Sequence, residues 1–302
     1  MDVSVCICTY RRAFVLNTIT SILAQVGLDK IRLEIVVCDD DPERSAQALI
    51  EKAAADSPIS IQYLSSGASN VSVARNSCLM EAKGRFVAFV DDDETCEPDW
   101  LSQLMLAQSK FGADVVKGFV RGRYPTDTPL WIRAGDPFTR DCGPTGTRIE
   151  TMGTGNVLFN RCFAINNGIR FDLQKGPGGG EDTDFFLRMN ECGARMIACR
   201  EAIVNEVVPD DRVTQEYIRR RFCHFGRMHG SGGVAHRLRA QTAWSFLKAV
   251  ARISLLWPFM LKLIERSPAF FQRVHFRGFA SFWYNIGRLE GMTFGRGSSR
   301  HS

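Results

Sequence analysis

The sequence lacks three patterns that would place it in other classes of protein. Its ten cysteines are scattered singly without a CxxC pair, which argues against a zinc site. The first predicted strand runs into Tyr10, Arg11 and Arg12 rather than a GxGxxG loop, so a nicotinamide-dependent enzyme is disfavoured. No basic leader with a cleavable apolar segment precedes that strand. Several cysteines lie inside apolar strands as small hydrophobes, and we expect a reducing, cytosolic compartment.

Long uncharged apolar runs are also missing. The most apolar segment, Trp244–Ile264, carries Lys248, Arg252 and Lys262, and its longest uncharged stretch is Ile253–Leu261. A membrane-spanning helix needs roughly 20 apolar residues, so we predict no span. At helical spacing the charges fall in one narrow stripe, which indicates an amphipathic helix lying in a membrane interface. The alternative is packing against the protein body or a second subunit.

Charge is divided unevenly along the 302 residues. The net charge is +5, but residues 212–302 hold 16 Lys and Arg against 3 Asp and Glu, which leaves the rest of the chain acidic. Basic residues interleaved with aromatic ones favour contact with an anionic membrane surface through residues 239–290. No nucleic-acid-binding motif accompanies the charge, so we expect no nucleic-acid partner. Nothing in the sequence indicates an oligomeric state.

Apolar strands and amphipathic helices alternate through the first 120 residues. Strands are predicted at 3–9, 33–38, 59–64, 86–90 and 115–120, with helices at 14–25, 45–55, 70–83 and 99–111. This alternation predicts an α/β fold with a Rossmann-like mixed sheet flanked by helices. After a proline- and glycine-rich region at 121–153, strands are predicted at 154–160, 196–198 and 203–208, and helices at 184–192 and 214–225.

Three carboxylates follow the fourth predicted strand. Asp91, Asp92 and Asp93 come directly after the apolar run Phe86–Val90, and the carboxyl ends of such strands are where ligands bind in open α/β sheets. No cation that would pair with them is evident in the sequence. Asp91 and Asp93 project to the same side of an extended chain, where Mg²⁺ or Mn²⁺ would relieve their repulsion. The alternative is a solvated acidic turn that caps the next helix.

Two further acidic pairs lie at predicted strand or loop ends. Asp39 and Asp40 close the second strand and can converge with Asp91–Asp93 on one rim of the sheet, placed to accept hydrogen bonds from a ribose or base. Glu181 and Asp182 follow a glycine-rich run. For that pair the alternative is a helix N-terminus, where acidic residues are favoured.

Five segments in order carry a family resemblance: Val3–Arg11, Glu34–Asp40, Asn70–Asn76, Phe89–Asp93 and Glu181–Arg188. Together they resemble the successive motifs of the family 2 inverting glycosyltransferases, over roughly residues 1–210. The resemblance implies a GT-A fold and a UDP-sugar donor. It implies two halves of one domain, a nucleotide-sugar-binding half (1–120) and an acceptor-binding and catalytic-base half (121–211). The charge and aromatic pattern adds a third part, a basic amphipathic helical extension that associates with the membrane (212–302).

The resemblance also implies a role for each motif residue. Asp182 would be the general base, supported by Glu181 and Asp184, and the metal would be held by Asp93 with Asp91. The glycines before the base, at 176 and 178–180, would let their loop close over the donor. The residues expected to bind the nucleotide-sugar are Thr9, Arg11, Asp39, Asp40, Arg75, Asp91 and Asp92.

The sequence departs from the family pattern in two places. Some relatives complete the metal site with a histidine, where this chain reads Val204–Val207, and Glu206 is the candidate replacement. Processive synthases carry a QxxRW motif and membrane spans, whereas Gln215–Arg219 reads QEYIR, so we expect an enzyme that adds a single sugar. The basic run Arg219–Arg221 either contacts a donor or acceptor phosphate or forms a solvated helix face.

Within the family, the sequence is most similar to bacterial exopolysaccharide enzymes of the succinoglycan type. This similarity implies transfer of one hexose, with glucose the first candidate, to a lipid-linked oligosaccharide at the inner face of the cell membrane, where the protein would bind peripherally. The first alternative is a nucleotidyltransferase, although the glycine-rich loop of such enzymes is absent. The second is a catalytically silent membrane-associated scaffold, against which the intact set Asp40, Asp91, Asp93 and Asp182 argues.

Overall fold

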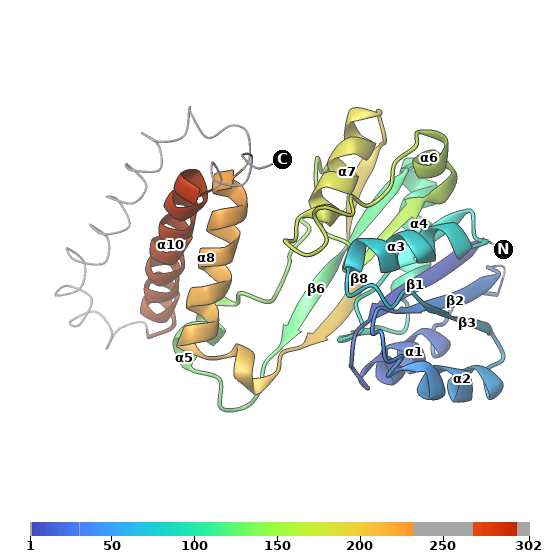
Figure 1. The fold of residues 1–302 in the computed structure, drawn as a ribbon, viewed down its shortest axis with the longest axis horizontal. Helices are drawn as coiled ribbons and strands as arrows, with labels where there is room; N and C mark the ends of the chain where they lie inside the picture. The colour runs from blue at the N-terminus through green and yellow to red at the C-terminus, as the bar shows by residue number, and fades with distance from the viewer. Residues whose placement is uncertain (1, 30, 232–267, 295–302) are drawn as a thin grey trace. The chain divides into compact units, whose positions relative to one another are not determined.

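The computed structural model describes residues 2–29, 31–231 and 268–294 (Figure 1). The chain divides into two compact units, the first formed by residues 1–122 and 138–207 and the second by 123–137 and 208–302. The three-part division expected from the sequence concerns function and stays a prediction.

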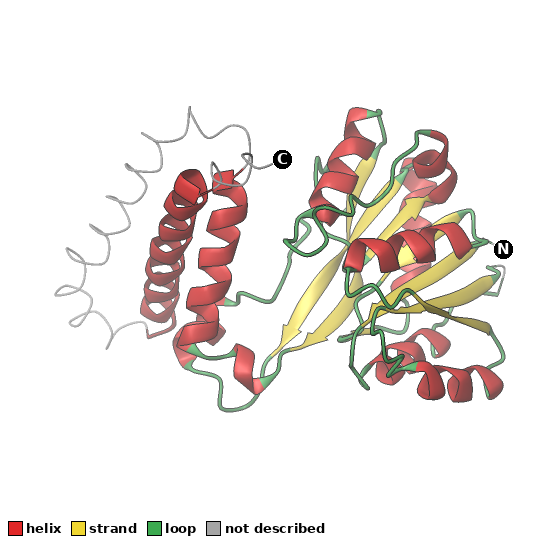
Figure 2. Cartoon of the chain, viewed as in Figure 1, coloured by secondary structure: helices red, strands yellow, loops and turns green. Residues whose placement is uncertain are grey.

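The first unit is built on one mixed sheet with helices packed against it (Figure 2). The sheet has eight strands among the described residues, in the order β3-β2-β1-β4-β7-β6-β8-β5. Strands β1 to β4 pair in parallel, while β7 runs antiparallel to β4 and β6, and β5 antiparallel to β8. This confirms the predicted mixed α/β sheet. The strands are β1 Val3–Thr9, β2 Leu33–Asp39, β3 Ser60–Ser65, β4 Phe86–Phe89, β5 Glu94–Cys96, β6 Val115–Arg123, β7 Val157–Asn160 and β8 Met196–Val207.

Helices cover both faces of this sheet because alternate strand residues point to opposite sides. Val5 and Ile7 of β1 pack in the core beneath α1, α2 and α4, whereas Cys6 packs in the core beneath α3, α6 and α7. All three side chains are fully buried, and each buried Val or Ile contributes about 1.5–3 kcal/mol to stability. The helices are α1 Val15–Leu23, α2 Gln47–Ala55, α3 Val71–Glu81, α4 Trp100–Phe111, α6 Arg161–Asn166 and α7 Glu181–Glu191.

Helices α5 (Leu130–Gly135) and α6 were not predicted, and three further elements differ from the prediction. One strand, β8, replaces the two predicted at 196–198 and 203–208, because the charged pair Arg200 and Glu201 lies exposed on a continuous strand rather than in a turn. Short β5 was not predicted, since Glu94 gives it no apolar alternation. Helix α7 begins three residues earlier than predicted, after Gly180 with φ +90°, so Glu181 and Asp182 lie in its first turn.

The second unit contains α5 Leu130–Gly135, a short 3₁₀ turn at Asp210–Arg212, α8 Gln215–Ser231 and α10 Pro268–Phe294. Helices α8 and α10 lie side by side (Figure 1). Gly226 of α8 faces the backbone of α10, and Gly287 and Gly291 of α10 face that of α8, so the backbones approach too closely for a Cβ. Trp131 of α5 packs against Phe276 of α10.

The predicted tail helices are only partly described. Segment 244–264 lies outside the described residues, whereas the aromatic and basic segment 270–284 falls within α10. None of the helices in the described ranges is long and apolar enough to cross a bilayer.

Candidate active site

Two adjoining cavities open in the first unit where β1 and β4 end and α3 begins. They adjoin because consecutive residues line them: Ala74 and Asp92 face one, Arg75 and Asp91 the other. The Asp40 pocket, of about 230 Å³, is lined by Cys8, Thr9, Tyr10, Arg12, Asp40, Val71, Ala74 and Asp92. The Asp182 cavity, of about 440 Å³, is lined by Arg75, Asp91, Lys117, Arg140, Asp141, Cys142, Ile149, Thr151, Met152, Gly153, Thr154, Gly155 and Asp182.

The acidic run after β4 has cationic partners that were not evident in the sequence. Arg12 Nη1 lies 2.7 Å from Asp92 Oδ1 and 2.7 Å from Asp93 Oδ2. Thr9 Oγ1 donates to Asp92 Oδ2 at 2.8 Å. Burial raises the pKa of Asp92 above its ordinary value, although the guanidinium of Arg12 opposes this. The loop after β1 therefore neutralises part of the acidic run, which the sequence analysis treated as unpaired.

Two residues predicted to bind the nucleotide lie outside the pocket walls. Arg11 Nε donates to Asp41 Oδ1 at 3.1 Å, and a φ of +54° at Arg11 turns the chain there. The fully buried carboxylate of Asp39 accepts hydrogen bonds from the backbone N–H groups of the following turn and from the Tyr63 hydroxyl. The structure places Tyr10 and Arg12 in the wall instead.

Asp40 and Thr9, in contrast, do lie in a cavity wall, and their binding of a nucleotide stays a prediction. Both line the Asp40 pocket, and Ser66 Oγ donates to Asp40 Oδ1 at 2.6 Å. The exposed ring of Tyr10 beside them offers a flat apolar surface, and a nucleobase stacks well on such a ring. An aromatic residue directly after a strand that ends at a rim is the signal that could have identified Tyr10.

Glu181 and Asp182 are brought together with Arg75 at the start of α7. Asp182 Oδ1 accepts the N–H of Thr183 at 2.6 Å, as an acidic residue in the first turn of a helix can. Glu181 is 5% exposed and forms an ion pair with Arg75 through Oε1, while Oε2 has no hydrogen-bond partner within the described part of the chain. Burial raises the pKa of Glu181, although Arg75 opposes this. Glu181 and Asp182 therefore lie at a helix N-terminus, and that N-terminus also forms part of the wall of the Asp182 cavity.

Asp184 faces other charges. Lys175 and Arg188 each form an ion pair with its carboxylate. Burial opposes their effect, but the two cations lower the pKa of Asp184 below its ordinary value. Lys175 begins the glycine-rich run, so Asp184 anchors that run to α7 and supports Asp182 through the backbone rather than by contact with the cavity.

A buried lysine fixes the loop that separates Asp91 from Asp182. Lys117 Nζ donates to the carbonyl oxygens of Gly153 and Gly155. A Cβ at Gly153 would lie 2.9 Å from Asp182 Oδ2, and one at Gly155 would lie 2.7 Å from Asp91 Oδ2. Burial, followed by the charge of Arg140, lowers the pKa of Lys117 to about 8. The lack of side chains at both glycines lets the two carboxylates face one cavity.

Beneath this loop lies an ion-pair network that sequence reasoning missed. Arg140 donates to Glu94 Oε1 at 2.8 Å and to Glu206 Oε2 at 2.7 Å. The Glu94 side chain is fully buried, and burial together with the charge of Asp91 raises the pKa of Glu94 to about 8. Glu206, the candidate replacement for a metal-binding histidine, therefore contacts a guanidinium. The position of Lys117 inside the apolar run VVKGFV could have identified it as a buried lysine, whereas no pattern in the sequence identifies Arg140 as a buried partner.

The carboxylate of Asp91 is the kind of oxygen ligand that a hard cation prefers. Across the described residues, no three His, Cys, Asp or Glu side chains are grouped to hold a metal ion. Mg²⁺, however, is commonly bound by one or two carboxylates and completed by water and substrate phosphates. Asp91 offers a carboxylate to the cavity, and Asp93, two residues on, is held by Arg12. Asp91 and Asp93 do not lie on an extended chain as expected, because the Glu94 N–H donates to the Asp91 carbonyl oxygen at 3.1 Å and forms a turn. Asp91 alone therefore offers a carboxylate to the Asp182 cavity, and metal binding stays a prediction.

Comparison with known proteins places this geometry in a family. A model of glycosyl transferase family 2 matches residues 4–168. The succinoglycan biosynthesis protein ExoM of Rhizobium meliloti is 38% identical over 254 residues, which cover 83% of this chain and 82% of that protein.

Solved structures of S. aureus TarS share the fold. The complex with UDP-GlcNAc aligns with a TM-score of 0.58 at 16% identity, and the complex with UDP with 0.57 at 17%; each covers 100% of this chain and 93% of the other. This likeness confirms the expected GT-A architecture of the mixed sheet. With the family model matching more than half of the residues and a relative this similar along most of its length, the chain belongs to glycosyl transferase family 2.

Proposed function

We propose that the protein transfers a single hexose, with inversion, from a UDP-sugar to a lipid-linked oligosaccharide during exopolysaccharide synthesis. The observation that carries this proposal is that residues adjacent in the chain line the two cavities: Ala74 and Asp92 line the Asp40 pocket, and Arg75 and Asp91 line the Asp182 cavity. A donor that spans both would hold its nucleoside in the first and its sugar beside the base in the second. The name of ExoM, a succinoglycan biosynthesis protein, supports a role in polysaccharide synthesis. The TarS complexes with UDP and UDP-GlcNAc support a uridine nucleotide as the carrier of the donor sugar. Glucose is the first sugar to test.

Asp182 would act as the general base. Its carboxylate faces the Asp182 cavity. The N-terminus of α7 favours the ionised form of this carboxylate, which is the form that can accept a proton. The acceptor hydroxyl attacks the anomeric carbon on the face opposite UDP, the proton passes to Asp182, and the bond to the diphosphate breaks. One such displacement inverts the anomeric centre. Glu181, fixed by Arg75, holds the start of the helix in place.

The leaving group is a diphosphate, and positive charge must face it. Arg75 lines the Asp182 cavity beside Asp91, and Arg12 lines the Asp40 pocket beside Asp92. Asp91 and Asp93 would hold a bound Mg²⁺ or Mn²⁺, which when present supplies further positive charge to the diphosphate. The cations of the chain itself orient the phosphates and keep the carboxylates from repelling them.

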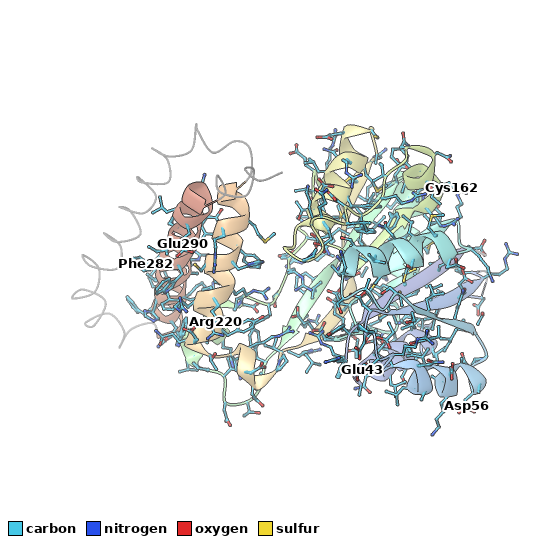
Figure 3. All side chains as sticks on the ribbon, in the orientation of Figure 1. Glu43, Asp56, Cys162, Arg220, Phe282 and Glu290 are labelled. Atoms are coloured by element: carbon cyan, nitrogen blue, oxygen red, sulfur yellow. The ribbon has the colours of Figure 1, made fainter. Side chains whose placement is uncertain are left out.

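Asp40 is expected to determine nucleotide affinity. Replacing Asp40 with Ala removes an acceptor for the base while leaving the pocket otherwise intact, so we expect UDP to bind about 10- to 100-fold more weakly, as for a lost charged hydrogen bond. Isothermal titration of UDP measures this. The matched control is Asp56→Ala, an exposed aspartate after α2 that Figure 3 labels and that lines neither cavity. Equal affinity in both variants would contradict the placement of the base.

The acceptor side of the proposal includes an anionic membrane surface. In α10, Arg273 and Arg277 alternate with aromatic residues, and Phe270 at its start is 61% exposed. We propose that residues 239–290 hold the protein peripherally at the inner leaflet of the cell membrane. The full chain should co-float with vesicles containing phosphatidylglycerol and not with neutral phosphatidylcholine vesicles. Co-flotation with neither composition would remove the membrane from the proposal.

The transfer assay tests the UDP-sugar donor and the lipid-linked acceptor together. The full chain is incubated with a panel of UDP-sugars and a lipid-diphosphate-linked oligosaccharide in anionic vesicles, with Mn²⁺ present. The proposal expects one UDP-hexose to lengthen the acceptor by one residue, with the opposite anomeric configuration in the product. Repeated addition would contradict single transfer, and retention would contradict the displacement at Asp182.

A further inference from the structure

Four of the ten cysteines meet beneath the Asp40 pocket. Cys6 and Cys8 lie on β1, Cys38 on β2 and Cys78 on α3, and all belong to or pack against the same apolar core. The Cys78 thiol packs among the other three, with its Sγ 4.0 Å from the backbone carbonyl oxygens of Ile7 on β1 and Val36 on β2. Cys6, Cys38 and Cys78 are fully buried, whereas Cys8 is partly exposed and lines the pocket beside Asp40. A reagent that enters the pocket therefore meets a single thiol of this group.

The two strands bring Cys8 and Cys38 into register. They are direct partners in the parallel pairing of β1 with β2, and both contribute to the face covered by α3. Neighbouring strands lie about 4.8 Å apart, inside the range of about 4.4–6.8 Å between Cα atoms that a disulfide requires. A hydrogen bond with Cys78 lowers the pKa of Cys38. The same interaction acts to lower the pKa of Cys8, but burial leaves the pKa of Cys8 raised, so the first exchange, which needs the Cys8 thiolate, requires alkaline pH.

We propose that Cys8 is a thiol modification site whose occupation blocks the nucleotide pocket, and that Cys38 is its resolving partner. This inference rests on the proposed UDP site. In the first step, the Cys8 thiolate attacks one sulfur of a small disulfide, the S–S bond of the reagent breaks, and the released thiolate takes up a proton. In the second, the Cys38 thiolate attacks the Cys8 sulfur and releases the second small thiol. Two protein thiols are thereby oxidised to one disulfide, and one small disulfide is reduced to two thiols.

Both products are expected to close the pocket to a nucleotide. An adduct on Cys8 adds atoms to a pocket of about 230 Å³, directly beside Asp40. A disulfide between Cys8 and Cys38 takes both thiols out of their packing in the core and changes the side chain that lines the pocket next to Thr9. We expect UDP affinity to fall about tenfold or more, the effect of overpacking a fitted site.

The experiment treats the full chain with hydroxyethyl disulfide at alkaline pH and then measures UDP binding by titration and thiol status by peptide mass spectrometry. Cys162, exposed at the start of α6 and labelled in Figure 3, is the internal control, because an adduct there lines neither cavity. We expect a Cys8–Cys38 linkage and loss of UDP binding. Addition of dithiothreitol should restore the two free thiols and UDP binding. UDP present during treatment should protect Cys8 and leave Cys162 reactive.

Two variants distinguish modification of Cys8 from general damage to the protein. In Cys8→Ala, treatment should change UDP affinity by less than twofold relative to the same untreated variant, and in Cys38→Ala the adduct should remain on Cys8 without a linkage. A Cys8 thiol that stays free while Cys162 reacts, or a treated protein that binds UDP as before, would overturn the inference. If the untreated protein binds no UDP, the proposed function fails, and peptide mapping still decides whether Cys8 and Cys38 react together.

Discussion

Replacing Asp182 with Asn is expected to lower the transfer rate about 10²–10⁴-fold, the usual contribution of a general base. The amide keeps the size of the side chain in the Asp182 cavity and can still contact the N–H of Thr183, but it cannot accept the proton of the acceptor hydroxyl. UDP affinity should change little, because Asp182 does not line the Asp40 pocket. Single-turnover transfer assays with titrated UDP separate the two quantities.

The control for this variant lies on the same helix. Glu191 ends α7, is exposed and lines neither cavity, so Glu191→Gln should transfer at the wild-type rate. If Asp182→Asn retained transfer within about tenfold of wild type, less than a general base ordinarily contributes, the base would lie elsewhere, and Glu181, with its unpartnered oxygen, would be the next carboxylate to test.

Arg140→Met is expected to produce the largest loss of stability. The substitution leaves the fully buried Glu94 and nearly buried Glu206 without their shared cation. Breaking a buried pair costs about 3–5 kcal/mol, and we expect about 2–4 kcal/mol because Arg140 is itself 37% exposed. Urea unfolding followed by circular dichroism measures the loss. Arg200→Met, which removes an exposed pair with Asp141, should cost less than about 1 kcal/mol.

The loss should depend on pH in a defined direction. Burial raises the pKa of Glu94 to about 8 in the folded protein, above the ordinary value of about 4.3 expected when unfolded. An acid whose pKa is raised by folding reduces stability as pH rises from the unfolded to the folded value. Arg140 opposes this rise in pKa, so its removal raises the folded pKa of Glu94 further and leaves the unfolded value unchanged. Wild type and variant should therefore lose stability in parallel between pH values of about 4.3 and 8, and the deficit of Arg140→Met should grow as the pH rises above about 8. A deficit that stays constant above pH 8 would mean that Glu94 is not the group left uncompensated.

The sheet could be predicted from sequence because strands β1, β2 and β4 are continuous apolar runs buried on both faces. Strand β8 was divided in the prediction, since the charges of Arg200 and Glu201 resemble a turn when their exposure at the surface is unknown. Short β5 depends on pairing with β8, a long-range contact that local pattern cannot supply.

The site was predictable where acidic residues end strands and not where a partner comes from a loop. Asp40, Asp91 and Asp182 do line the two cavities, because each lies at an element terminus on the expected rim. Arg12 and Arg140 were missed, since their roles follow from loop conformations that bring them to Asp92 and Glu94. The choice between Arg11 and Arg12 depends on one backbone angle at Arg11, which sequence does not reveal.

The central claim is that this chain binds a uridine nucleotide at the Asp40 pocket with a divalent cation held by Asp91 and Asp93. Calorimetric titration of UDP into the full chain, with and without Mn²⁺, tests it most directly. The account predicts binding that strengthens with Mn²⁺ in the wild type, and no strengthening in Asp93→Ala. Absence of UDP binding in both conditions would contradict the account and favour another nucleotide or a catalytically silent scaffold.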